Sequence, residues 1–182
     1  TLLLLLVAAD RGLAATVGSD DGWQFAYNGF AGTNLTLDGV AKVTPNGLLM
    51  LTNGTIQTKG QAFHPSPLMF RAEANGTGAV RSFSTTFVFA IYGQYADLSS
   101  HGMAVFVSAS RELLSTASPG QFLGLLNGTN GNRSARIFAV ELDTFKDYEL
   151  RDINDNHVGV DVDSLVSIDS ANAGYYDDGT GM

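Results

Sequence analysis

Short segments in which apolar and polar side chains alternate are the feature that most limits what this chain can fold into. Three valines of NHVGVDVDS (156–164) fall on one face of an extended backbone, and the opposite face carries His157, Gly159 and Asp161. The segment SFSTTFVFAI (82–91) also has a period of two, with one strongly apolar face. Other strand-like runs are NGLLMLTN (46–53), GMAVFVSAS (102–110) and RIFAVELDTF (136–145), whereas only SRELLSTA (110–117) suggests a helical turn. Many short strands at regular spacing predict an all-β sandwich.

Composition narrows the class of protein further. The chain has 182 residues with 21 glycines and no cysteine, so we expect one domain that is stabilised by its core rather than by disulfides. Its formal net charge of -8 argues against nucleic acid as a partner, because phosphate binding needs clustered Lys and Arg.

The N-terminal residues TLLLLLVAADRGLAA resemble a secretory leader. An apolar stretch is followed by small residues, and it is too short to span a bilayer. We therefore predict that residues 1–15 are a signal peptide remnant, with cleavage near Ala15, and that residues 16–182 form the mature domain. The alternative is that the apolar stretch is a buried first strand.

N-x-[ST] sequons give independent support for secretion. Such motifs mark glycosylation at surface turns of secreted proteins. The chain has five, at Asn34, Asn53, Asn75, Asn127 and Asn132.

The acidic segment VELDTFKDYELRDINDNHVGVDVDS (140–164) is the candidate functional site. Glu141 and Asp143 are two residues apart on a predicted strand, so their carboxylates share one face. Carboxylates together with an imidazole, here that of His157, suit a transition metal, and oxygen ligands suit calcium. A solvated acidic turn and a pair of catalytic carboxylates are the alternatives, and the residues alone leave all three readings open.

The chain resembles the legume-type (L-type) lectin domain over roughly residues 23–176. The motifs that carry the resemblance occur in order: FAYNGF, LTLDGVAKVTPNGLLMLTN, GQAFHPSPLMF, SFSTTFVFAI, HGMAVFVSAS, FLGLLN and VELDTF…NHVGVDVDSLVS. Their wording is most similar to the ectodomains of plant lectin receptor kinases. The resemblance implies a jelly-roll sandwich of a flat back sheet, a curved front sheet and a small top sheet.

The resemblance also implies two structural cations side by side in the acidic segment. A transition metal, usually Mn²⁺, would be held by Glu141, Asp143, Asp152 and His157, and Ser167 would hold a water beside it. Ca²⁺ would be held by Asp143, Asp152, the side chain of Asp147 and the backbone carbonyl of Phe145.

Two of the four elements with which the family binds sugar differ here. His101 stands where the family has an Asp, and a neutral imidazole offers one acceptor where a carboxylate offers two oxygens. Asp147 stands where the family has an Asn, so calcium binding is kept but the amide donor is lost. A backbone donor near Gly120 and Gln121 and an aromatic platform at Phe145 match the family. We therefore expect weak or absent binding of simple monosaccharides, and the alternative for His101 is a loop residue that is bonded locally without a ligand.

Three functions follow as hypotheses. The first is a calcium-dependent, lectin-like extracellular recognition domain that binds a glycan or cell-surface ligand. The second is a degenerate lectin fold that recognises a peptide, protein, nucleotide or apolar ligand. The third is a glycosidase, which needs two carboxyls about 5–5.5 Å apart. Phe145 and Lys146 stand where the second Glu of such enzymes would be, so we expect no enzymatic activity from this fragment.

The remaining expectations concern the whole protein. We expect location in the secretory pathway, outside the cell or on the outer side of the plasma membrane. The resemblance implies that the final strands, a membrane span and a Ser/Thr kinase domain lie beyond Met182, and the acidic C-terminus, which ends without a closing strand, agrees with this. A homodimer through the back sheet is a further expectation, and His64 in AFHPSPL is interpreted as a packed loop residue.

Overall fold

The fold is taken from a computed structural model, which describes residues 2–5, 24–71, 78–93, 100–128 and 136–174. Within these ranges the chain forms ten β-strands and three short 3₁₀-helices and has no α-helix. It divides into two compact units, residues 1–53 with 60–92 and residues 54–59 with 93–182. The predicted domain, residues 16–182, spans both units.

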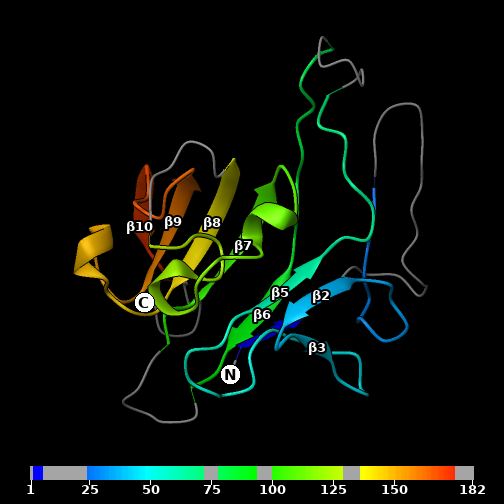
Figure 1. The fold of residues 1–182 in the computed structure, drawn as a ribbon, viewed down its shortest axis with the longest axis horizontal. Coiled ribbons are helices and arrows are strands. Elements are labelled where there is room, and N and C mark those ends of the chain that lie inside the picture. The colour runs from blue at the N-terminus through cyan, green and yellow to red at the C-terminus, as the bar shows by residue number, and fades with distance from the viewer. Residues whose placement is uncertain (1, 6–23, 72–77, 94–99, 129–135, 175–182) are drawn as a thin grey trace, which may run out of the picture. The chain divides into compact units, whose positions relative to one another are not determined.

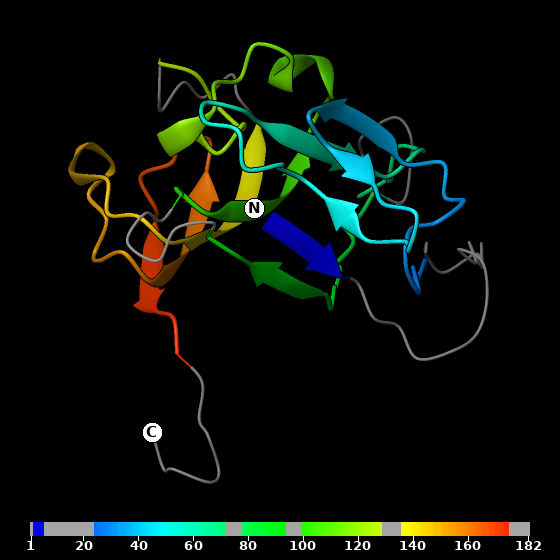
Figure 2. The ribbon, with the colours of Figure 1, turned by 90° about the horizontal axis from the view of Figure 1, so that it is seen from below.

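The first unit contains two antiparallel sheets. One sheet has the order β3 (Lys42–Val43), β4 (Leu49–Met50), β1 (Leu2–Leu5) and β6 (Val88–Ile91), and β1 can be followed in dark blue beside green β6 in Figure 2. The other sheet pairs β2 (Thr36–Gly39) with β5 (Gly60–Phe63). Tyr27, Phe30 and Leu49 form a buried cluster in this unit, with the Tyr27 and Phe30 rings stacked at 5.4 Å.

The first of these strands lies in the segment predicted to be a secretory leader. Leu2–Leu5 pairs with both β4 and β6, which corresponds to the alternative of a first strand. The predicted cleavage site near Ala15 lies outside the described residues, so the leader stays a prediction.

Strand β6 is shorter than the alternating pattern of residues 82–91 predicts. It covers only Val88–Ile91, and these four residues are the ones that pair with the four residues of β1. A strand needs a partner for its backbone N–H and C=O groups, so the periodic pattern extends further than the sheet.

The second unit carries the candidate site. Its antiparallel sheet has the order β10 (Asp169–Asn172), β9 (His157–Val162), β8 (Ile137–Asp143) and β7 (Met103–Ser108), coloured from red to green in Figure 1. The 3₁₀-helices are η1 (Glu112–Leu114), η2 (Gly120–Phe122) and η3 (Tyr148–Leu150). The predicted strands in 102–110, 136–145 and 156–164 and the helical turn in 110–117 are confirmed.

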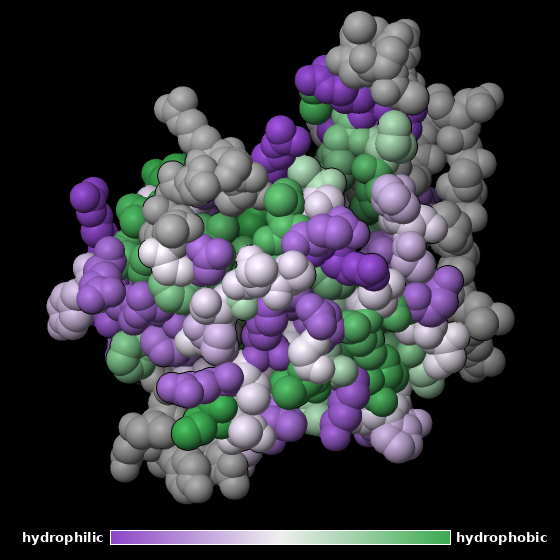
Figure 3. Space-filling view, in the orientation of Figure 1, coloured by the Kyte–Doolittle hydropathy of each residue, from purple (hydrophilic) through white to green (hydrophobic). Residues whose placement is uncertain are grey.

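The surface carries polar and apolar residues interspersed on the face in Figure 3. Asn34 and Asn53 are exposed and Asn127 is half-buried, whereas Asn75 and Asn132 lie outside the described residues. Glycosylation at these positions stays a prediction. Within the described ranges, no helix has the length and apolarity needed to cross a membrane.

Candidate metal centre

The pairing of β8 with β9 gathers the acidic residues on one face of the sheet. Alternate residues of β8 are buried, including Glu141 and Asp143, and so are His157, Gly159 and Asp161 of β9. The register sets Asp143 opposite His157 and Glu141 opposite Gly159. Side chains of directly opposed residues lie on the same face, so the strands alone bring three of the predicted ligands together.

The loop between β8 and β9 supplies the fourth predicted ligand, Asp152. Leu150 at the end of η3 is buried and anchors the loop, and Arg151 takes a left-handed conformation that turns the chain into Asp152. The backbone N–H of Asp147 donates to Asp152 Oδ2 at 2.6 Å, and the backbone N–H of Phe145 donates to Asp143 Oδ1 at 2.6 Å. These bonds hold both carboxylates in place on the inner side of the loop.

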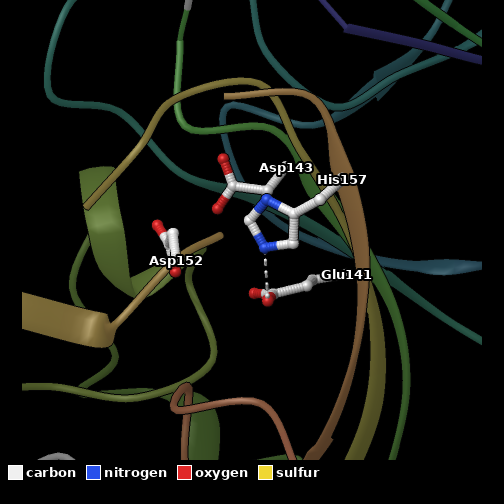
Figure 4. A group of neighbouring side chains, drawn as sticks. All are labelled: Glu141, Asp143, Asp152 and His157. Carbon is white, nitrogen blue, oxygen red and sulfur yellow. Dashed lines mark ion pairs between the residues drawn. The ribbon is translucent and has the colours of Figure 1, made fainter. Parts of the chain in front are cut away.

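Four of the predicted ligands form one compact group. Glu141, Asp143, Asp152 and His157 each offer a ligand atom, and these atoms all lie within 4.8 Å of one another. Figure 4 shows the four side chains pointing toward a common centre, with an ion pair drawn between His157 and Glu141. The structure thus brings together the four residues that were predicted to hold a transition metal, and their role as ligands stays a prediction.

The orientation of His157 suits a metal ligand. Its Nδ1 lies 2.9 Å from the carbonyl oxygen of Asn154, which can only accept a hydrogen bond, so Nδ1 carries the proton. In the neutral ring the lone pair of Nε2 faces the acids, with Glu141 Oε1 at 3.5 Å, and the contact is an ion pair only when Nε2 is protonated as well. Metal-binding histidines commonly donate their other ring N–H to a carbonyl in this way.

A second layer of residues fixes Glu141. Ser167 Oγ lies 2.7 Å from Glu141 Oε1 and 2.9 Å from Asp161 Oδ1. A Cβ built on Gly159 would lie 2.4 Å from Glu141 Oε1, so this glycine leaves the space that the carboxylate occupies. Asp161 is fully buried, and its Oδ2 has no hydrogen-bond partner.

Gly159 and Asp161 were missed as site residues from the sequence, although a signal existed. The alternation of NHVGVDVDS places both on the face of His157, and that face was already assigned to the site. The carbonyl of Asn154 had no comparable signal, because a backbone contact across a loop leaves no mark in residue type.

Burial makes the carboxylates of this group hard to ionise. Burial, with a smaller contribution from the Asp152 charge, raises the pKa of Asp143 to about 7 against the opposing effect of the Phe145 N–H. Burial raises the pKa of Asp161 to about 7 as well, with the Glu141 charge adding to the effect. Burial also raises the pKa of Glu141 and of Asp152.

These properties fit a divalent cation. No lysine or arginine is among the buried residues of the described ranges, so His157 is the one buried side chain there that can carry a positive charge beside the clustered carboxylates. Three carboxylates and one imidazole are a donor set for a transition metal, whereas calcium takes oxygen ligands alone. The predicted calcium ligands Asp143 and Asp152 belong to the same group, and Asp147 is joined to Asp152 through its backbone.

The residues predicted to contact a ligand lie beside this group. His101 Nδ1 is 2.7 Å from Asp147 Oδ2, and its ring centroid is 4.8 Å from that of Phe145. A Cβ built on Gly120 would lie 3.7 Å from His101 Nε2. The side chain of Gln121 donates to Glu149 Oε2 at 3.5 Å and so reaches the loop that carries Asp147.

His64 differs from the other two histidines. Its ring lies 4.4 Å from that of Phe25, and its Nδ1 lies 2.8 Å from the carbonyl oxygen of Ser66. These local contacts agree with the interpretation of a packed loop residue.

Comparison with known proteins identifies the family. A profile of the legume lectin domain matches residues 22–180. The chain belongs to the legume lectin domain family. Since the matched family is a lectin domain rather than an enzyme, the expectation that the fragment is no enzyme is supported.

Relatives of this legume lectin domain include plant receptor kinases. It is 55% identical over 181 residues to the L-type lectin-domain containing receptor kinase SIT2 of Oryza sativa subsp. japonica, covering 99% of this chain and 26% of that protein. It is 51% identical over 163 residues to the L-type lectin-domain containing receptor kinase IV.1 of Arabidopsis thaliana, covering 88% of this chain and 24% of that protein. The legume lectin domain thus spans about a quarter of the length of these curated relatives.

Solved legume lectins share the fold. The Lotus tetragonolobus seed lectin superposes with a TM-score of 0.62 at 21% identity, over 81% of this chain and 64% of that one. Lectin UEA-II, solved in complex with galactose, superposes with a TM-score of 0.59 at 22% identity, over 79% of this chain and 62% of that one. These likenesses confirm the predicted fold class, the all-β fold of legume lectins.

Proposed function

We propose that this domain is a carbohydrate-recognition module whose binding loops are ordered by Ca²⁺ and by a transition metal such as Mn²⁺. The observation that carries the proposal is the compact group of Glu141, Asp143, Asp152 and His157, with an exposed aromatic ring and a glycine loop next to it. The family match supports the lectin character of the domain. What we propose is that it binds these metals and a sugar.

In this proposal the chain's own residues have separate tasks. His157 and Glu141 would hold the transition metal, Asp143 and Asp152 would serve both ions, and Asp147 with the Phe145 carbonyl would complete the calcium site. When bound, the ions neutralise the carboxylates and so fix the loop after β8. The Phe145 side chain, 42% exposed, then serves as the stacking platform for an apolar sugar face, and the turn at Gly120 and Gln121 supplies a backbone donor.

The setting of the domain is part of the same proposal. Relatives at 51–55% identity are receptor kinases, which supports a place on the outer side of the plasma membrane with a kinase domain in the parent protein. The predicted leader and the sequons agree with this location. Glycans are the proposed partners, because lectin UEA-II was solved with galactose, and a homodimer through the back sheet stays a prediction.

A second candidate function rests on His101 and Asp147. Both differ from the family's sugar-binding residues, which favours a lectin fold whose ligand is a peptide, protein, nucleotide or apolar molecule. The metal centre would serve both functions equally, because it orders the binding loops and does not itself select the ligand.

The test is a glycan array probed with the full chain in Ca²⁺ and Mn²⁺ and repeated with a chelator. We expect glycan binding that the chelator abolishes, and a thermal unfolding temperature that rises when the metals are added. The Asp143→Asn variant should lose both effects. Asp169→Asn is the matched control, because Asp169 is exposed on the edge strand of the same sheet.

Two results would contradict the proposal. Glycan binding that persists in chelator would remove the role of the metals. A metal-stabilised chain that binds no glycan on the array would favour the second candidate function.

A further inference from the structure

The two residues that depart from the family's sugar-binding pattern contact each other. His101 and Asp147 are 46 residues apart in sequence, yet His101 Nδ1 lies 2.7 Å from Asp147 Oδ2. The Asp147 side chain is 10% exposed and that of His101 is 30% exposed, so the bond forms at the edge of the buried acidic group. From the sequence, the substitutions at positions 101 and 147 looked like two independent losses of a sugar contact. In the structure the two side chains are hydrogen-bonded to each other.

This contact fixes which atoms remain for a ligand. An ionised carboxylate only accepts hydrogen bonds, so His101 Nδ1 carries the proton and donates it to Asp147 Oδ2. In the neutral ring, Nε2 then keeps its lone pair and is an acceptor. A Cβ built on Gly120 would lie 3.7 Å from Nε2, so Nε2 lies beside this glycine, and the 30% exposure of the His101 side chain leaves the ring accessible to a ligand.

The position of His101 is itself constrained by its neighbours. Gly102 takes a φ of +102°, and a Cβ there would lie 2.1 Å from the carbonyl oxygen of Leu142. Thr144 Oγ1 donates to the carbonyl of Ser100. The turn that carries His101 is thus joined on both sides to the end of β8, next to Phe145.

We propose that His101 and Asp147 act as one unit that determines ligand specificity. Asp147 Oδ2 is occupied by His101 and is not presented to the ligand, and His101 Nε2 is the acceptor that the ligand meets instead. The inference rests on the proposed function, since it assigns the ligand chemistry of that same site. The site takes a saccharide through one hydroxyl that donates to Nε2, with the apolar face of the sugar on Phe145, rather than through a pair of hydroxyls on one carboxylate.

The exchange conserves the local charge. The family's pair is a carboxylate at position 101 and an amide at 147, and this chain has an imidazole at 101 and a carboxylate at 147. Each arrangement has one negative charge and one donor nitrogen between the two positions, although the amide carries two N–H groups and the neutral imidazole only one. Changing one member alone should therefore harm the site more than changing both.

The first test reads the proton on His101 directly. The chain has three histidines, so long-range ¹H–¹⁵N spectra of the full chain at pH 8 are simple to assign, with His101→Asn identifying the signals of His101. We expect His101 as the Nδ1–H form in the parent, and we expect Asp147→Ala to shift it toward the Nε2–H form while His64 stays unchanged. An Nε2–H form of His101 in the parent would overturn the pairing, whether or not the chain binds metals or sugars.

The second test exchanges the pair. We compare His101→Asp, Asp147→Asn and the double variant in Ca²⁺ and Mn²⁺, using methyl α-galactoside and methyl α-mannoside as probes. The affinity of the double variant for one of these sugars should be about tenfold higher than the value obtained by multiplying the effects of the two single substitutions. The reason is that substitutions of residues in contact are not additive in free energy. Single effects that simply multiply would overturn the inference. If no variant binds either sugar, the proposed function is contradicted instead. The position of the proton on His101 would still test the pairing of His101 with Asp147.

Discussion

Glu141 and Gly159 face each other across β8 and β9, and a Cβ on Gly159 would lie only 2.4 Å from Glu141 Oε1 and 2.1 Å from Ser167 Oγ. The proposed metal centre therefore depends on the absence of a side chain at Gly159. Glu141 is 2% exposed and is hydrogen-bonded to Ser167, so it has little room to move away.

Gly159→Ala should therefore weaken metal binding without removing any ligand. The added methyl group displaces Glu141 or Ser167, and overpacking of this kind costs about 1–3 kcal/mol of folding free energy. We expect Mn²⁺ affinity, measured by titration calorimetry, to fall about tenfold or more, as happens when residues that orient metal ligands are changed. Gly174→Ala is the matched control, because a Cβ at Gly174 meets nothing within 4 Å. Equal metal affinity of the two variants would contradict the role assigned to Gly159.

Asp143→Asn should change stability in opposite directions with and without metal. In chelator at pH 8 the variant should be more stable than the parent by on the order of 1 kcal/mol, because a buried charge among other carboxylates is removed. The asparagine side chain still offers an oxygen to the Phe145 N–H. With Ca²⁺ and Mn²⁺ the order should reverse, since the variant lacks a bridging carboxylate. Urea unfolding under both conditions checks this, and a variant that is less stable in both would show that Asp143 stabilises the fold without a cation.

The metal-free chain should lose stability as the pH rises from about 4 to about 7. Asp143 and Asp161 have a folded-state pKa of about 7, above that of the unfolded chain, so the folded state holds protons that the unfolded state has released. Folding stability then falls with pH across this window. Urea unfolding in chelator at pH 5 and pH 8 measures the effect.

Metal should reverse this pH dependence. The ligands must lose their protons to bind a cation, so affinity rises with pH and the holo chain should be more stable at pH 8 than at pH 5. A metal-free chain that is more stable at pH 8 than at pH 5 would contradict the raised pKa values of these carboxylates.

Asp161→Asn should reduce the number of protons released when Mn²⁺ binds. Burial and the Glu141 charge raise the pKa of Asp161 to about 7, so near neutral pH Asp161 holds a proton that a cation beside it would displace and that the variant lacks. The asparagine oxygen can still accept from Ser167. Calorimetry in two buffers of different ionisation enthalpy counts the protons, and an unchanged count would show that Asp161 takes no part in the titration of the site.

The sequence by itself determined the face on which each site residue lies. A period of two places Glu141 and Asp143 together on one strand and His157, Gly159 and Asp161 together on another, because successive side chains of a strand point to opposite sides. That pattern, with the family resemblance, was sufficient to predict the four residues whose ligand atoms meet.

The tertiary structure decided everything that depends on which segments are neighbours. The register of β8 against β9 sets Glu141 opposite a glycine, the Asn154 carbonyl determines which nitrogen of His157 carries the proton, and His101 reaches Asp147 across 46 residues. It also limits β6 to the four residues that meet β1. Local periodicity contains no information on such pairings, because they arise from contacts between segments that are distant in sequence.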